Sequence, residues 1–172
     1  RMAQRGGGGR RGRQRRQQQN YEELDKYPVL PPHAFARIVR DLRTLNIVYQ
    51  VIEPPLTKKE EEVRAEIQDI FVQALTADIQ EIDANPELYL RAAMDQIVKS
   101  YRLKVNKKSR SKIFYYLKRD LIGYGRMDVL MNDANVEDVS LDGTNIPIFA
   151  YHRKFESTET TIAWPNDHEL ES

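Results

Sequence analysis

The stretch KIFYYLKRDLIGYGRMDVLMNDANVEDVSLDGTNIPIFAYHRKF, from Lys112 to Phe155, decides the fold, because helical and extended patterns follow one another in it with clear boundaries between them. Its first part places Ile113, Leu117 and Leu121 on one face of a helix. This pattern stops at Gly123, since glycine supplies the flexible backbone that a helix end needs. The first part therefore predicts an amphipathic helix.

The second part of the stretch changes from helical to strand periodicity. A short helix is expected over Met127 to Met131, and from Val136 polar and apolar residues alternate with period two. Asp142-Gly143 supplies residues that accept positive φ angles, which a tight reversal requires before a second strand over residues 146–152. We therefore expect a β-hairpin after the short helix.

Two further amphipathic helices precede this stretch. Thr57 and Glu60 have the spacing of a capping box at the start of one, and Asn85-Pro86 suits the start of the next. We expect the third helix, the one that runs into the stretch, to be capped by Ser109. The apolar positions that form the stripes of the first two helices are Val63, Ile67, Ile70, Phe71, Ala74 and Leu75, and Leu90, Met94, Ile97, Val98 and Tyr101.

The region before the first helix is less clear from its residues alone. The prolines of Tyr27 to Pro32 favour an extended strap laid across the domain. Apolar spacing in Ala34 to Leu45 fits a helix as well as a strand, whereas Ile47 to Ile52 alternates as an antiparallel strand does.

Four short motifs in order give the chain a resemblance to a known family. They are YQVIEPPLT (Tyr49 to Thr57), YYLKRDLIGYGRMDVLMND (Tyr115 to Asp133), VEDVSLDG (Val136 to Gly143) and IFAYHRKF (Ile148 to Phe155), the last followed by Thr160-Thr161-Ile162. In this order and spacing, the chain from Tyr27 to Trp164 resembles the N-terminal domain of archaeal type II/IV secretion ATPases, the motors of secretion, type IV pilus and archaellum systems. The resemblance implies that Ala34 to Glu53 forms a β-hairpin.

What the resemblance implies about function is a regulatory and assembly domain. Such a domain would close over nucleotide held by a RecA-like ATPase domain, in the same chain or a neighbouring subunit of a homo-hexamer, and transmit motion to a polytopic membrane platform protein. ATP and Mg²⁺ are implied for the full-length parent, and no cofactor is expected in this chain. The implied location is cytoplasmic, at the inner face of the membrane.

Charge divides the chain into a basic tail and an acidic body. Residues 1–16 hold seven arginines and no acid, whereas the remaining residues carry 20 Lys and Arg against 26 Asp and Glu. We interpret residues 1–20 as a disordered tail, because its glycine and glutamine runs cannot form a core. Its basic surface of Arg10, Arg11, Arg13, Arg15 and Arg16 either binds nucleic acid or anionic membrane or only solubilises the chain. A stand-alone interaction module working through this tail is the alternative function.

A second basic cluster follows the second helix, at Lys99, Arg102, Lys104, Lys107, Lys108, Arg110 and Lys112. Cations with nearby aromatic residues can form a nucleic-acid surface. Lysines near a helix C-terminus and aromatic residues facing a core account for the same pattern, so we do not expect nucleic acid as a partner.

The residues predict no catalytic centre. The chain lacks the phosphate loop G-x-x-x-x-G-K-[ST], so we expect it to be inactive alone even if its parent is an ATPase. No cysteine and three scattered histidines give no zinc spacing, so no metal site is predicted. Strand alternation would place His152 and Lys154 on one face and Arg153 on the other. We take Arg153 and Lys154 as candidates to face the nucleotide cleft of the parent.

Together these patterns predict an α+β fold with an N-terminal β-hairpin, three main helices and a small C-terminal antiparallel sheet from Val136 to Trp164. At 172 residues we expect one domain over residues 21–172 outside the tail. With 40% hydrophobic residues the chain can build a core, and no apolar run is long enough to predict a membrane span.

Overall fold

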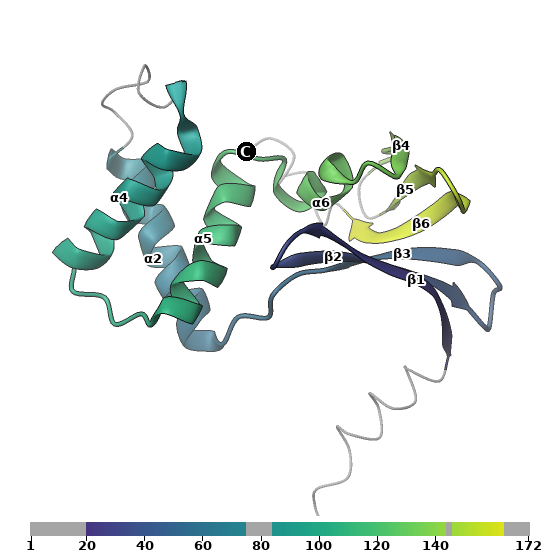
Figure 1. The fold of residues 1–172 in the computed structure, drawn as a ribbon, viewed down its shortest axis with the longest axis horizontal. Coiled ribbons are helices and arrows are strands. Elements are labelled where there is room, and N and C mark those ends of the chain that lie inside the picture. The colour runs from purple at the N-terminus through teal and green to yellow at the C-terminus, as the bar shows by residue number, and fades with distance from the viewer. Residues whose placement is uncertain (1–19, 75–83, 144–145, 164–172) are drawn as a thin grey trace, which may run out of the picture. The chain divides into compact units, whose positions relative to one another are not determined.

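A computed structural model describes residues 20–74, 84–143 and 146–163 of the chain (Figure 1). These residues divide into two compact units. The first, here called the sheet unit, comprises residues 20–52 and 132–163, and the second, the helical unit, comprises residues 53–131.

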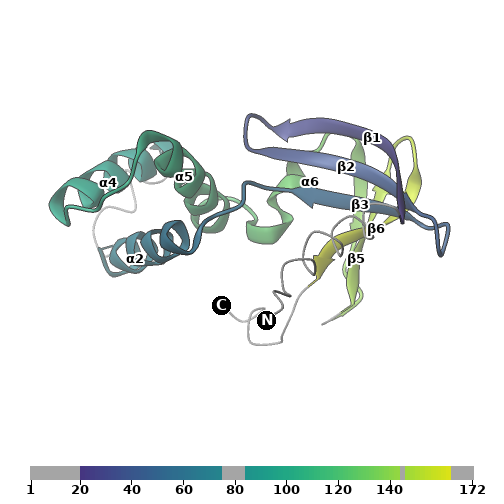
Figure 2. The ribbon, with the colours of Figure 1, turned by 90° about the horizontal axis from the view of Figure 1, so that it is seen from below.

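The sheet unit contains one six-stranded sheet (Figure 2). Its strand order is β1-β2-β3-β6-β5-β4, in which β1, β2 and β3 pair antiparallel and β4, β5 and β6 do the same. A short parallel pairing of β3 with β6, Val48 opposite Glu159 and Tyr49 opposite Thr160, joins the two halves into one mixed sheet. The strands are β1 Tyr21–Leu30, β2 Ala34–Asp41, β3 Ile47–Ile52, β4 Val136–Ser140, β5 Pro147–His152 and β6 Glu156–Ala163.

The N-terminal part of this sheet confirms one prediction and corrects another. Ala34–Asp41 is a strand paired with β3, so the expected hairpin is present. The proline-containing segment, in contrast, is no separate strap: Tyr21–Leu30 is the edge strand β1, with Tyr27 opposite Ala36. An edge strand tolerates Pro28 because the missing backbone donor need not pair with a neighbour. The peptide bond between Pro31 and Pro32 is cis.

The buried side chains of the sheet unit follow the alternation of its strands. Ala34, Ala36 and Ile38 are fully buried on β2, while the residues between them are only partly buried. Ile148 and Ala150 repeat this pattern on β5. The face that these residues share carries the core of the unit.

The helical unit packs three helices side by side, as Figure 1 shows. They are α2 Lys58–Ala74, α4 Pro86–Ser100 and α5 Lys107–Leu121, followed by the short η1 Gly125–Met127. The last helix, α6 Asp128–Asn132, spans the boundary between the units. The helical core consists of Ile67, Phe71, Leu90, Met94, Ile97, Val98, Ile113, Phe114 and Leu117. Leu75 lies outside the described residues, and Tyr101, placed on the apolar stripe by its spacing, is 57% exposed.

Two of the three predicted helix starts are confirmed. Glu60 N donates to Thr57 Oγ1 and Thr57 N donates to Glu60 Oε1, which is the capping box. Asn85 accepts from Leu88 N with Pro86 in the first turn. The Ser109 cap is wrong, because α5 begins earlier: Asn106 is the cap, and its Oδ1 accepts from Ser109 N at 2.8 Å.

The end of α4 has a specific turn geometry. Leu103 N donates to Val98 O at 3.0 Å and Arg102 N to Lys99 O at 3.3 Å, the paired bonds of a Schellman motif. The motif requires a left-handed residue, and Arg102 adopts it with φ of 52°. A position that glycine would fill without strain is thus occupied by a long basic side chain.

The α+β class is therefore as predicted, with a mixed six-stranded sheet in place of a separate C-terminal one. Within the described part of the chain, no helix is both long and apolar enough to cross a bilayer.

Candidate functional site

The two candidate cations lie on a turn, and this corrects the expected strand alternation. β5 ends at His152, and residues 153–155 form the turn that leads into β6. Because Arg153 and Lys154 are outside the strand, the period of two does not separate them. Both side chains are exposed, that of Arg153 by 66%.

The backbone of this turn is held by hydrogen bonds from inside the sheet unit. Lys154 N donates to His152 Nδ1 at 3.1 Å, and Phe155 N lies 3.4 Å from the same nitrogen. Arg153 N donates to Asn135 O at 2.8 Å, which ties the turn to the loop before β4. The turn is therefore fixed mainly by three backbone donors, and the Arg153 side chain adds one long hydrogen bond, from Nη2 to Ala134 O at 3.4 Å.

His152 in turn belongs to a buried polar cluster formed by Tyr27, Tyr49, Asp133 and His152. Tyr27 Oη and Tyr49 Oη donate to Asp133 Oδ2 at 2.5 and 2.6 Å, and Tyr27 Oη lies 3.0 Å from His152 Nε2. Asp133 Oδ1 accepts from Asn135 N at 2.9 Å. The cluster thus connects β1, β3 and β5 to the loop before β4.

The protonation state of the cluster follows from its contacts. His152 Nδ1 accepts backbone N–H groups, so the ring carries its proton on Nε2, which then donates to Tyr27 Oη. Burial lowers the pKa of His152. Burial is also the larger cause, and the hydrogen bond to Asp133 the next, of the raised pKa of Tyr27 and Tyr49. At neutral pH the cluster therefore holds a neutral histidine and two neutral tyrosines.

This cluster supports structure rather than catalysis. The exposed fractions of Asp133 and His152 are 6% and 2%, so neither group can exchange protons directly with a bound molecule at the surface. Through His152 the cluster supports the exposed turn of residues 153–155. There Arg153 Nε lies 3.9 Å from Glu137 Oε1, an exposed pair of little strength, and Lys154 lies over the Phe155 ring. The geometry offers two exposed cations on a fixed backbone.

The other predicted basic surface, Arg10, Arg11, Arg13, Arg15 and Arg16, lies outside the described residues. Among the residues that are described, no group of three or more His, Asp or Glu side chains is arranged to hold a metal ion.

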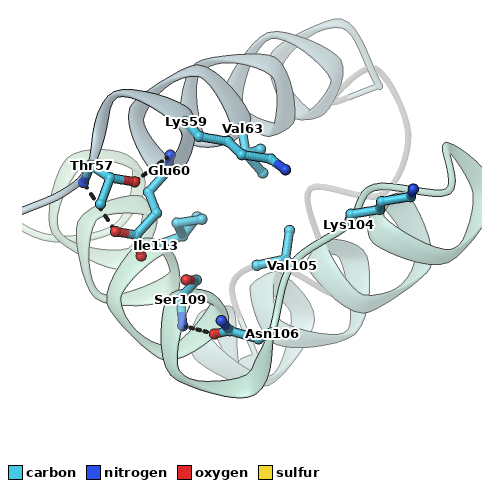
Figure 3. A pocket seen from close by; sticks show the side chains of 9 residues that line it. All are labelled: Thr57, Lys59, Glu60, Val63, Lys104, Val105, Asn106, Ser109 and Ile113. Atoms are coloured by element: carbon cyan, nitrogen blue, oxygen red, sulfur yellow. Dashed lines mark hydrogen bonds between the residues drawn. The ribbon is translucent and has the colours of Figure 1, made fainter.

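In the helical unit, a pocket of about 200 Å³ lies between the starts of α2 and α5 (Figure 3). Lys59 of α2 and Lys104 of the α4–α5 loop line it, together with Thr57, Glu60, Val63, Val105, Asn106, Ser109 and Ile113. The ion pair with Lys112 at 2.8 Å, the Thr57 backbone N–H and the Ser109 hydroxyl lower the pKa of Glu60 to about 2. The carboxylate is therefore charged, and its Oε1 is engaged by Lys112 Nζ and Thr57 N.

A wider recess of about 360 Å³ lies beside Tyr116 and the prolines that follow β3. Its two arginines are paired: Arg119 with Glu53 at 3.0 Å and Asp120 at 2.8 Å, and Arg64 with Asp120 at 3.3 Å. Because each guanidinium already has a carboxylate, the recess offers no spare charge to a ligand.

Sequence reasoning missed the buried cluster. Tyr49 and Asp133 are 84 residues apart and Tyr27 and Asp133 are 106 apart, so no local spacing signals their contact. The available sign was that Asp133 directly follows a short helix and precedes a strand, where an aspartate often accepts backbone hydrogen bonds.

Comparison with known proteins gives relatives without assigned roles. No protein-family model matches the chain. The chain is 38% identical over 125 residues to the uncharacterized protein MJ1288 of Methanocaldococcus jannaschii, a match covering 72% of this chain and 50% of that protein. It thus spans about half the length of that relative.

Two shorter matches come from the same organism. The uncharacterized protein MJ0900 is 33% identical over 69 residues, which is 40% of this chain and 12% of that protein. The uncharacterized protein MJ0781 is 42% identical over 50 residues, 28% of this chain and 6% of that protein. Segments of this chain therefore have counterparts within much longer chains.

Proposed function

We propose that the chain is the N-terminal regulatory and assembly domain of a hexameric type II/IV secretion, pilus or archaellum motor ATPase. In this role it closes over nucleotide held by an adjacent RecA-like domain and couples that closure to a polytopic membrane platform protein. ATP and Mg²⁺ are bound by the RecA-like domain, and the assembly works at the cytoplasmic face of the membrane.

The observation that best supports this proposal is the turn that carries Arg153 and Lys154. A cation that favours a closed state must reach a phosphate without first giving up a carboxylate partner, and these two side chains are exposed and weakly paired. Their backbone is fixed by His152, so little ordering is needed when the cleft closes.

Two further findings agree with a domain that works inside a larger protein. The motif order Tyr49 to Thr57, Tyr115 to Asp133 and Ile148 to Phe155 resembles the N-terminal domain of such motors. Two of the relatives contain their matching segment as only 12% and 6% of their own length.

The test measures ATP turnover by this domain joined to its RecA-like ATPase domain. Arg153→Ala is expected to lower turnover about tenfold or more, because it removes a charge that favours the closed state, and Lys154→Ala is expected to lower it less. Arg43→Ala is the matched control, since Arg43 also lies on an exposed turn of the sheet unit, with a side chain 65% exposed.

The melting temperature of the isolated chain separates a functional from a structural effect. We expect both substitutions on the 153–155 turn to leave it nearly unchanged. Equal turnover in the Arg153→Ala and Arg43→Ala proteins would mean that Arg153 is an exposed surface residue with no role in turnover. A failure of the chain to bind any P-loop ATPase domain in a pull-down would remove the motor proposal itself.

A further inference from the structure

The helical unit carries an uninterrupted basic segment. Residues 96–119 contain nine lysines and arginines and no aspartate or glutamate. The later cations in this segment are neutralised from other parts of the unit: Arg110 by Asp95, Lys112 by Glu60 and Lys118 by Glu87. The earlier ones are exposed, and no ion pair is formed by any of them within the described chain. We call these the loop cations: Lys99, Arg102, Lys104, Lys107 and Lys108.

The loop cations gather where α4 ends and α5 begins. Lys59, at the start of α2, lines the same pocket as Lys104, and so adds a sixth positive charge to this surface (Figure 3). The first turns of α2 and α5 both line the pocket, and helix N-termini contribute partial positive charge. Glu60, the acid in the pocket, is already paired with Lys112 and does not neutralise the loop cations.

Arg102 is held on this surface at a cost to stability. Its left-handed backbone, with φ of 52°, is one that glycine adopts freely and arginine does not. Tyr101, directly before it, is 57% exposed and leaves the helical core. The end of α4 therefore presents an aromatic ring between Lys99 and Arg102.

Nucleic acid and anionic lipid are the two polyanions that such a surface could meet, and the aromatic residues favour lipid. Stacking of successive bases needs several exposed rings among the cations, whereas Phe114 and Tyr115 are each only 8% exposed and leave Tyr101 to stack alone. A single tyrosine flanked by lysine and arginine suits the headgroup level of a bilayer, where the ring is partly buried and the charges meet phosphates.

We propose that the α4–α5 loop, through Tyr101 and the loop cations, binds the surface of a membrane rich in anionic lipid. The contact is made by the helical unit itself and does not depend on the motor proposal. It is also separate from the arginine tail, which lies elsewhere in the sequence.

The experiment is co-sedimentation of the full chain with vesicles of phosphatidylcholine alone or of equal parts phosphatidylcholine and phosphatidylglycerol. Binding is expected only to the anionic vesicles and is expected to weaken as salt rises. The triple variant Lys104→Gln/Lys107→Gln/Lys108→Gln is expected to bind roughly 100-fold more weakly at low salt. The matched control, Lys26→Gln/Arg40→Gln/Arg43→Gln, removes the same charge from the sheet unit and keeps the tail, so it is expected to bind as the parent chain does.

Arg102→Gly supplies a second readout that a purely structural role would not produce. It relieves the left-handed strain and removes a charge, so we expect the melting temperature to rise by a few degrees while vesicle binding falls. Leu45→Gly is its control, because Leu45 also has a positive φ, of 63°, and carries no charge. Leu45→Gly is expected to leave binding unchanged.

Three results would overturn the proposal. The first is equal vesicle binding by the triple variant and its matched control. The second is an Arg102→Gly protein that binds as tightly as the parent chain. The third is binding of a single-stranded oligonucleotide that depends on the loop cations while vesicle binding does not.

Discussion

Asp133 is the residue on which the buried polar contacts of the sheet unit converge. Its carboxylate accepts from two tyrosine hydroxyls and one backbone N–H, and it is 6% exposed. Asp133→Ala leaves the hydroxyls of Tyr27 and Tyr49 without their acceptor, so we expect a loss of about 3 kcal/mol in the free energy of unfolding. Urea denaturation followed by circular dichroism measures it.

Two controls show whether this loss comes from the buried hydrogen bonds. Tyr49→Phe removes one donor without opening a large cavity and is expected to cost about 1 kcal/mol. Asp138→Ala removes an exposed carboxylate that accepts from the neighbouring Val139 N, and is expected to cost less than about 0.5 kcal/mol. Similar losses for Asp133→Ala and Asp138→Ala would contradict the central place given to Asp133.

His152 makes the stability of the sheet unit depend on pH. Burial lowers the pKa of His152, and the charges that face it are Asp133 and Asp25, which oppose this shift, and Lys154 and Arg153, which add to it. Because the folded pKa lies below the unfolded value, the unfolded chain binds the proton more readily. The contribution of neutral His152 to the free energy of unfolding is therefore complete above about pH 6.5 and is lost as pH falls through the folded pKa.

The measurement is the free energy of unfolding across this pH range. His152→Asn, which keeps an acceptor near the position of Nδ1 but does not titrate, is expected to flatten the fall below pH 6.5. His33→Asn is the comparison, since burial also lowers the pKa of His33 and its removal is expected to change the curve in the same direction. An unchanged slope in His152→Asn would mean that other groups control the acid response.

At the scale of elements, the sequence predicts best what is decided locally. The Thr57 and Glu60 capping box and the Asn85 cap involve residues three apart, and both are present as expected. The predicted start of α5 lies too late in the chain, because Ser109 and Asn106 are both good caps. Asn106 is the cap since its side chain accepts from the N–H of Ser109, so the serine lies inside the first turn.

Elements defined by distant partners were harder to predict. β1 is a strand only because it pairs with β2, and its prolines gave a stronger local signal for an unpaired extended segment. The parallel pairing of β3 with β6 joins residues about 110 apart, and nothing in the alternation of either strand shows which edge it will meet.

The candidate site, too, has features that the local sequence predicts and features that depend on distant residues. Arg153 and Lys154 were found because they follow a strand pattern directly, but their turn conformation depends on His152 Nδ1 and on Asn135 O. The loop cations were visible as a basic cluster. Which of them lack a carboxylate partner could not be predicted, because the acids that pair with Arg110, Lys112 and Lys118 lie 15 or more residues away.

At the scale of the whole molecule, each unit carries exposed cations to which a partner is assigned above. The sheet unit presents the turn at residues 153–155, and the helical unit presents the loop cations. In the proposed motor the first meets nucleotide and the second meets lipid, so a change at one surface is expected to leave the other function intact. The single domain predicted for residues 21–172 stays a prediction.

The last prediction concerns the chain by itself, which we expect to hydrolyse no ATP. Phosphoryl transfer depends on a phosphate loop with its lysine and Mg²⁺ ligand, and no segment of the sequence has that spacing. The glycines in the body of the chain have other roles: a Cβ at Gly123 would meet Asp128 Oδ1, and Gly125 begins η1 with a φ of 58°. Phosphate release with Mg²⁺ and ATP is measured across the gel-filtration peak of the purified chain. Magnesium-dependent hydrolysis that follows this peak would show that the chain holds a catalytic centre of its own, and the regulatory role proposed for it would be wrong.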